Sequence, residues 1–165
     1  MRGLWLITLA TLLNYIVLVG VGMTQLVPLT DGLQPLDLRI AGYSHADVMA
    51  YVATLDRQAI SLLNILRWID TSFPLLFSLA MIGWGRRWAQ NFPLHTRALV
   101  VLLPLAYFVA DMVENSLVAR IFTKAMPSVE LVQMASTVTV LKFVAVGLAL
   151  LLLAGLGYRA ATRKG

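Results

Sequence analysis

Hydrophobic residues occur along the chain in four long blocks, at about residues 4–27, 59–85, 98–122 and 131–158. Each block exceeds the roughly 20 residues that an α-helix needs to cross the hydrocarbon core of a bilayer. The second block is the most polar of the four, because Asn64, Arg67, Asp70 and Pro74 interrupt it. The pattern predicts an all-α fold: an integral membrane four-helix bundle, with residues 1–165 forming a single transmembrane domain.

The first block carries no charge from residue 4 to residue 27. It is longer than the about 7–15 apolar residues of a signal peptide and ends without a small-residue cleavage site. We therefore expect an uncleaved first span.

The segment between the first two blocks, residues 28–58, has a different pattern. Ser44 followed by Asp47 is typical of a helix N-cap with an acidic third position. Val48, Val52 and Leu55 then recur at helical spacing, which predicts a short amphipathic helix. Upstream, apolar and polar residues alternate over 36–40, a weak strand pattern. We expect this segment to form a cap loop over one end of the bundle.

Composition supports insertion in a membrane. The chain is 59% hydrophobic and only 13% charged, against about 25% charge in a typical soluble domain. The absence of cysteine excludes disulfides, thiolate metal sites and cysteine nucleophiles. The only histidines, His45 and His95, lie in connecting segments, so we expect no haem, no metal and no other cofactor.

The charged residues predict an orientation. Basic residues flank the ends of the spans at Arg2, between the second and third spans, and after the fourth, whereas the cap loop is mainly acidic. The positive-inside rule then places both termini in the cytoplasm and residues 28–58 outside, in a bacterial inner (plasma) membrane. The net charge of +5 follows from the same flanks, so a nucleic-acid partner is not expected.

Ionisable residues also occur inside the spans, at similar depths. Asp111, Glu114 and Asn115 share one face of the third span, while Asp70 and Lys142 fall near the midplane of the second and fourth. An isolated charge there costs at least about 2.5–3.5 kcal/mol. We therefore expect these side chains to face the bundle interior and one another.

This arrangement yields two sets of candidate site residues. Asp111 and Glu114 cannot both stay ionised in a low dielectric unless Lys142 or Arg67 compensates, and a protonated carboxyl beside an ionised one suits proton transfer. The candidate catalytic residues are Asp111, Glu114, Lys142 and Asp70. The candidate ligand-binding residues are Asn115, Arg67, Asn14, Tyr107 and Thr139.

Structural interpretations stand beside these. Hydrogen bonding between helices is the favoured role of Asn14, Ser78, Ser136 and Thr139, and Gly20 and Gly22 are typical of close helix packing. The ion pairs could serve only as a structural lock. A metal site from the acids with His45 is chemically allowed, but the neighbouring Lys142 and Arg67 argue against a dication, so no metal ligand is assigned.

Three stretches, PLDLRIAGYS, DTSFP and DMVEN, together resemble a pattern in small bacterial four-helix integral membrane proteins. The resemblance covers the cap loop and the second and third spans. It implies the four-span architecture and no particular activity.

The sequence thus favours a membrane protein that binds an amphipathic or lipidic small molecule, or acts on it by acid–base chemistry. Two alternatives remain. One is a proton- or ion-coupled carrier, which would need a homo-oligomer because a single four-helix unit without repeats is small for alternating access. The other is a non-catalytic accessory subunit of a larger membrane complex.

Overall fold

The computed structural model describes residues 1–124 and 126–162, and 84% of the chain is helical. The elements are, in order, α1 (Arg2–Val21), a π-helical segment η1 (Gly22–Leu26), α2 (Val27–Leu29), a 3-10 turn η2 (Leu36–Leu38), α3 (His45–Ala53), α4 (Arg57–Trp88), α5 (Leu94–Phe122) and α6 (Val129–Thr162). No strand occurs among the residues that the structure describes.

Each hydrophobic block lies within one long helical stretch. The first covers Arg2–Leu29, because α1 continues through η1 into α2, and the others coincide with α4, α5 and α6. All four are long and apolar enough to cross a membrane. The expectation of four long apolar helices is therefore confirmed.

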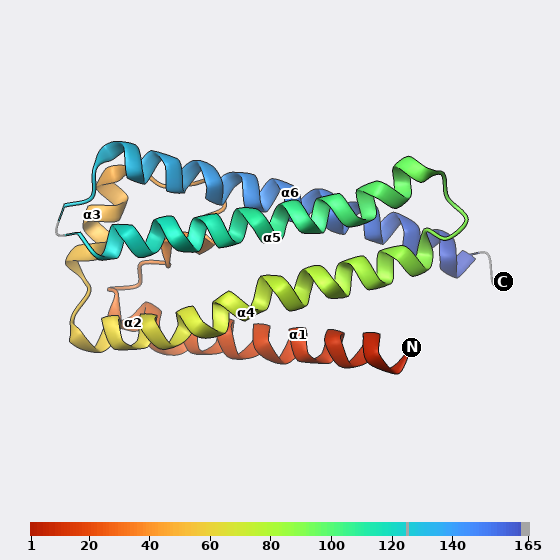
Figure 1. Ribbon diagram of the computed structural model, residues 1–165. Helices are drawn as coiled ribbons and strands as arrows, with labels where there is room; N and C mark the ends of the chain where they lie inside the picture. Colours follow the sequence, from red (N-terminus) through yellow and green to blue (C-terminus); the bar gives the residue numbers. More distant parts are fainter. Residues whose placement is uncertain (125, 163–165) are drawn as a thin grey trace.

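Consecutive long helices run in opposite directions along the bundle (Figure 1). The start of α1, the α4–α5 connection and the end of α6 lie at one end of the bundle, and α3 lies at the other. We call these the basic end and the capped end. Arg163 and Lys164, which entered the prediction of orientation, lie outside the described residues.

The four helices do not share one core equally. α5 packs most extensively against α6, and α4 packs against α5 and, less, against α6. By contrast, α1 packs mainly on α4. In the most apolar 18-residue stretch of Arg2–Leu29 only 6% is buried, against 28% in the corresponding stretch of α4. The bundle is a three-helix core of α4, α5 and α6 with α1 along its outside (Figure 1).

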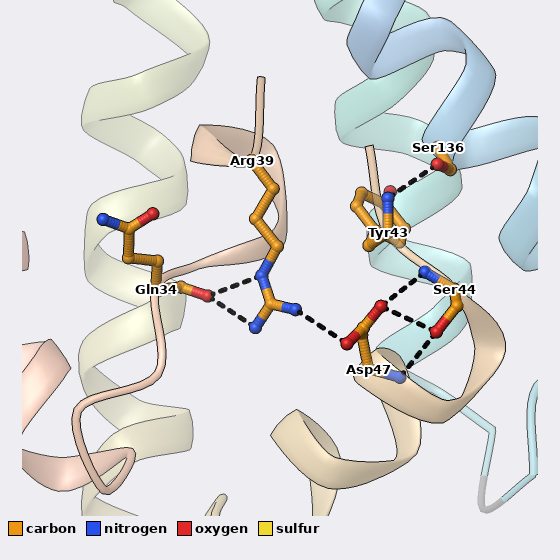
Figure 2. A network of polar contacts seen from close by, with 6 residues as sticks. All are labelled: Gln34, Arg39, Tyr43, Ser44, Asp47 and Ser136. Carbon is orange, nitrogen blue, oxygen red and sulfur yellow. Dashed lines mark hydrogen bonds and ion pairs between the residues drawn. The ribbon is translucent and has the colours of Figure 1, made fainter. Parts of the chain in front are cut away.

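The cap forms the predicted short helix but not the strand. Ser44 and Asp47 make a reciprocal capping box at the start of α3, as Figure 2 shows. The stretch 36–40, in contrast, contains the 3-10 turn η2. The strand expectation was wrong because an alternating pattern needs a partner strand to satisfy its backbone groups, and the described chain provides only helices.

The cap packs onto the end of α5 and the start of α6. Its buried residues Leu36, Val48 and Tyr51 form one hydrophobic cluster with Leu117 of α5 and Val132 of α6. The backbone N–H of Tyr43 donates to Oγ of Ser136 on α6 at 2.8 Å (Figure 2). The cap is therefore part of the folded core and closes this end of the bundle.

Close packing of the helices uses glycines other than those expected. No neighbouring atom lies within 4 Å of a Cβ added at Gly20 or Gly22, so the expectation for these two was wrong. At Gly83 and Gly85 of α4, an added Cβ would lie 2.5 Å from Leu4 and from Val100 respectively. These positions let α1 and α5 approach α4 because a larger residue would collide there.

Proline affects α4 close to the polar residues. Pro74 is buried within the helix, and its missing N–H leaves the carbonyl of Asp70, four residues earlier, without its usual helical donor. A helix bends at such a position, and α4 changes direction along its length in Figure 1. The bend lies one turn from the candidate residue Asp70.

Candidate functional site

A buried ion-pair group joins α5 to α6 beneath the cap. Asp111 and Glu114 lie one turn apart on α5 and both point towards Lys142 of α6. Lys142 Nζ lies 3.3 Å from Oδ1 of Asp111 and also pairs with Oε2 of Glu114. All three residues are buried, Glu114 completely. The spacing of three residues along α5 allows both carboxylates to reach one ammonium.

The second oxygen of each carboxylate has its own donor. Thr139 Oγ1, one turn before Lys142 on α6, donates to Oε1 of Glu114. Asn115 Nδ2 donates to Oδ2 of Asp111 at 3.1 Å. Thr139 therefore belongs to the polar group itself, because its hydroxyl bonds a buried carboxylate of α5 as well as the backbone of its own helix.

The cap contributes a partner that the sequence analysis left undecided. The backbone carbonyl of Asp37, in η2, accepts a hydrogen bond from Lys142 Nζ at 3.2 Å. The ammonium thus forms ion pairs with Asp111 and Glu114 and donates a hydrogen bond to the Asp37 carbonyl. No sequence motif predicts this contact. Which main-chain carbonyl accepts from Lys142 depends on the path of the loop and not on residue type.

Two further carboxyl groups lie within electrostatic range. Asp70 of α4 is half-buried and interacts with Asn115, with Asp111 and with Asp37. The Asp37 side chain interacts in turn with Lys142. The group therefore contains four carboxyls, Asp37, Asp70, Asp111 and Glu114, and one ammonium, a surplus of three carboxyls.

Tyrosine side chains border the group on two sides. Tyr107, one turn before Asp111 on α5, is buried, packs edge-on against Phe77 of α4, and lies within electrostatic range of Asp111 and Asp70. Tyr43 of the cap lies beside Thr139 and near Glu114. Tyr107 was among the predicted residues, whereas Tyr43 was missed because nothing in the loop sequence indicates which way it points.

The remaining predicted residues lie elsewhere. Arg67 is exposed on α4, and it forms no ion pair among the described residues. Asn14 joins α1 to α4 through a 2.6 Å hydrogen bond to Oγ of Ser72. Ser78 similarly joins α4 to α5 by donating to the carbonyl of Pro104 at 2.9 Å. Asn14 and Ser78 thus make the helix–helix hydrogen bonds expected for them.

His45 does not reach the buried group. Its Nε2 lies 2.9 Å from the carbonyl of Pro127, so it ties the start of α3 to the connection between α5 and α6. No group of three or more potential metal ligands gathers anywhere in the described part of the chain. The carboxylates of Asp111 and Glu114 pair with the ammonium of Lys142.

The electrostatics of the cap reflect this enclosure. Burial raises the pKa of the Asp37 carboxyl, and the positive charge of Lys142 only partly opposes the effect. Burial also raises the pKa of the Tyr43 hydroxyl to about 12, while the neighbouring Thr139 side chain acts in the opposite direction. Low-dielectric surroundings disfavour the charged form of each group. The cap therefore seals the ion pairs from bulk water on this side.

No family model, curated protein or solved structure matches the chain.

Proposed function

We propose that this is a multi-pass membrane protein whose buried group beneath the cap binds an amphipathic or lipidic small molecule and exchanges protons with it. The observation that carries the proposal is the surplus of carboxyls around Lys142. In low dielectric, several carboxylates around one cation cannot all stay ionised. The group therefore needs protons, or a ligand that supplies hydrogen-bond donors or positive charge.

The contacts indicate the chemistry of the ligand. Lys142 is buried and already paired with two carboxylates and a main-chain carbonyl of the protein, and Arg67 is exposed. Neither cation is therefore available for an anionic headgroup. The half-buried carboxyls of Asp70 and Asp37 are the groups with remaining acceptor capacity. A neutral headgroup with hydroxyl or amine donors, or a cationic amine, fits these acceptors.

The roles we assign follow from this difference between groups that are already paired and groups that can still accept hydrogen bonds. Asp70 and Asp37 contact the ligand and exchange protons with it, and Tyr107 borders the same space. Asp111, Glu114 and Lys142 hold the surrounding charge in place, with Thr139 and Asn115 satisfying the second oxygens. Acid–base chemistry on the bound molecule would use the carboxyl that carries the proton.

The test uses Asp70→Asn, with Arg67→Gln as a matched control on the exposed face of α4. Each protein is purified in mild detergent, and the small molecules and lipids extracted from it are compared by mass spectrometry. We expect one class with amine or hydroxyl headgroups to be enriched in the wild type and in Arg67→Gln and lost in Asp70→Asn. Identical extracts from all three proteins would contradict the proposal.

Whether the buried group holds a proton can be measured independently. Infrared spectra of the wild type should show the carbonyl stretch of a protonated carboxylic acid at neutral pH, and Asp70→Asn should change that band. A spectrum with no such band in either protein would mean that every carboxyl is ionised, and the proton-exchange part of the proposal would then be wrong.

A structural lock is the second candidate. It is favoured by one observation: each oxygen of Asp111 and of Glu114 has an ion-pair or hydrogen-bond partner within the protein, and so does Lys142. A lock needs no ligand. Under this alternative, Lys142→Met combined with Asp111→Asn and Glu114→Gln would keep the fold and also the extracted small molecules unchanged.

We also propose that the basic end faces the cytoplasm, in a bacterial inner membrane. The chain has no cysteine, so single cysteines introduced at Gln34 and Gln90 report cleanly on the two ends. Gln34 lies in the cap and Gln90 in the α4–α5 connection, and both are exposed. An impermeant thiol reagent added to intact cells should label only position 34. Labelling of both, or of position 90 alone, would contradict this orientation.

A further inference from the structure

We propose that a cleft at the basic end is a binding site for the headgroup of an anionic phospholipid. The cleft lies between the start of α1, the end of α4 and the start of α5, and its volume is about 810 Å³. Three arginines line it together with apolar and aromatic side chains: Arg86, Arg87, Arg97, Leu4, Trp84 and Val101. The proposal requires the bundle to sit in a bilayer, but it is independent of the group around Lys142.

The arginines of this cleft have no partners within the protein. Arg86, Arg87 and Arg97 are exposed, and none of them forms an ion pair or a side-chain hydrogen bond within the described residues. Guanidinium groups that remain unpaired can each present a fork of N–H donors to phosphate oxygens. Three such groups around one cleft form a site for an anion.

No aspartate or glutamate side chain of α4 or α5 lies near these arginines along the helices. Between Asp70 on α4 and Asp111 on α5, the sequence has no acidic residue at all. Arg86 is 86 − 70 = 16 residues beyond Asp70, and Arg97 is 111 − 97 = 14 residues before Asp111. At about 1.5 Å per residue these separations are roughly 24 and 21 Å along the helices, beyond the Debye length of about 8 Å. An anion bound from outside the described chain would supply the compensating negative charge.

The walls of the cleft indicate a lipid as the source of that charge. Leu4 and Val101 provide an apolar surface beside the arginines. Trp84 packs edge-on against Trp5, with the ring centroids 4.9 Å apart. It also packs at a tilt against Trp88, with the ring centroids 5.4 Å apart. Tryptophans gather at the level where lipid headgroups meet the hydrocarbon. A phosphate bound by the arginines would thus lie at headgroup depth, with its glycerol and acyl chains along the apolar wall.

A glycine sets how closely two walls of the cleft approach. Gly83 allows Leu4 of α1 to contact α4, because a Cβ added there would lie 2.5 Å from the leucine Cδ1. The cleft is thereby bounded by α1 on one side and by the start of α5 on the other. Basic pockets of this kind between membrane helices bind anionic headgroups such as those of phosphatidylglycerol and cardiolipin.

The test measures lipid binding by native mass spectrometry on the full chain in non-ionic detergent. Dioleoyl phosphatidylglycerol, dioleoyl phosphatidylcholine and sodium phosphate are titrated separately. The variant is Arg86→Gln/Arg97→Gln, and the control is Arg57→Gln/Arg120→Gln, which removes the same charge from exposed positions towards the capped end. We expect the wild type and the control to prefer phosphatidylglycerol. The preference should fall about 25-fold in the variant, at about fivefold per arginine.

Each other outcome overturns the inference. Equal binding of the two lipids by the wild type would mean that the cleft has no selectivity for anionic headgroups. An equal loss in variant and control would mean that only net charge matters. Tight binding of sodium phosphate that blocks phosphatidylglycerol would identify a free-anion site instead of a lipid site. Asp70→Asn should keep the lipid preference, which separates this test from that of the proposed function.

Discussion

At the capped end of the molecule charged groups are buried and paired within the chain, whereas at the basic end arginines are exposed and have no carboxylate near them. Lys142 of α6 has partners on two other elements: Asp111 and Glu114 on α5, and the Asp37 carbonyl in the cap. The residues that line the cleft around Arg97 include no aspartate or glutamate. Removing one charge should therefore have very different consequences at the two ends, because only a buried group loses partners that solvent cannot replace.

The largest effect should come from Lys142→Met. Loss of the ammonium leaves Asp111 and Glu114 buried without a cation, and breaking a buried pair in this way costs about 3–5 kcal/mol. Arg97→Met at the basic end should change stability by less than about 0.5 kcal/mol in phosphatidylcholine micelles, as exposed substitutions usually do. The measurement is the free energy of unfolding of each variant in detergent.

A compensating variant sharpens this prediction. Adding Glu114→Gln to Lys142→Met removes one of the two buried carboxylates left without a cation. The double variant should therefore recover a large part of the lost stability. Equal losses of unfolding free energy for Lys142→Met and Arg97→Met would contradict the expected difference between the two ends.

The next effect concerns docking of the cap. Gly42 has a positive φ of 82°, and a Cβ added there would lie 2.6 Å from Oγ of Ser136 on α6. Gly32 has nearly the same φ, 80°, but no neighbour within 4 Å. Gly32→Ala should therefore cost only the left-handed backbone strain of about 1–2 kcal/mol.

Gly42→Ala should cost more than Gly32→Ala, because the cap must also move away from α6. It should in addition increase hydrogen exchange at the amide of Tyr43, which bonds Ser136. If the two alanine variants are equally stable and equally protected, the close approach of the cap to α6 does not contribute to stability.

A smaller effect should appear on acidification. Hydrogen bonds from the hydroxyl and backbone N–H of Ser44 hold the pKa of Asp47 below its ordinary value of 3.8. Because the folded-state pKa is the lower one, Asp47 stabilises α3 above the ordinary value, and this contribution is lost as the pH falls through the folded-state pKa. NMR signals of the Val48 methyl groups should report loosening of α3 in that range.

Ser44→Ala provides the control for this pH dependence. It should destabilise α3 by about 1 kcal/mol at neutral pH and reduce the acid-dependent part of the change, because only the backbone N–H of residue 44 then remains to bond Asp47. An acid transition of the same size in the wild type and in Ser44→Ala would assign it to another group.

The smallest effect should come from Tyr51→Phe. The Tyr51 ring is completely buried in the cap, and its hydroxyl oxygen has no hydrogen-bond partner among the described residues. Removing an unpaired polar atom is nearly neutral or stabilising, so the change should stay within about 0.5 kcal/mol of zero. A loss above about 1 kcal/mol, the usual worth of a hydrogen bond, would reveal a bound molecule at this hydroxyl.

The sequence by itself determined the long helices of this protein and the short helix of its cap. Apolar blocks of sufficient length allow only helices in a bilayer, since each backbone group must be satisfied within its own segment. The capping box at Ser44 is likewise local, because its partners lie three residues apart. Even the meeting of Asp111 and Glu114 with Lys142 follows from depth and helical spacing, because isolated charges there are too costly.

Only the tertiary structure decided which elements share a core and what surrounds the ammonium. Packing leaves α1 on the outside of α4, although its sequence is among the most apolar. The third acceptor of Lys142 is the main-chain carbonyl of Asp37, and every residue carries such a carbonyl. Arg67 is exposed although its spacing would allow an inward position. These outcomes depend on the path of the cap and on the rotation of each helix about its axis, and both are set by contacts between residues far apart in the sequence.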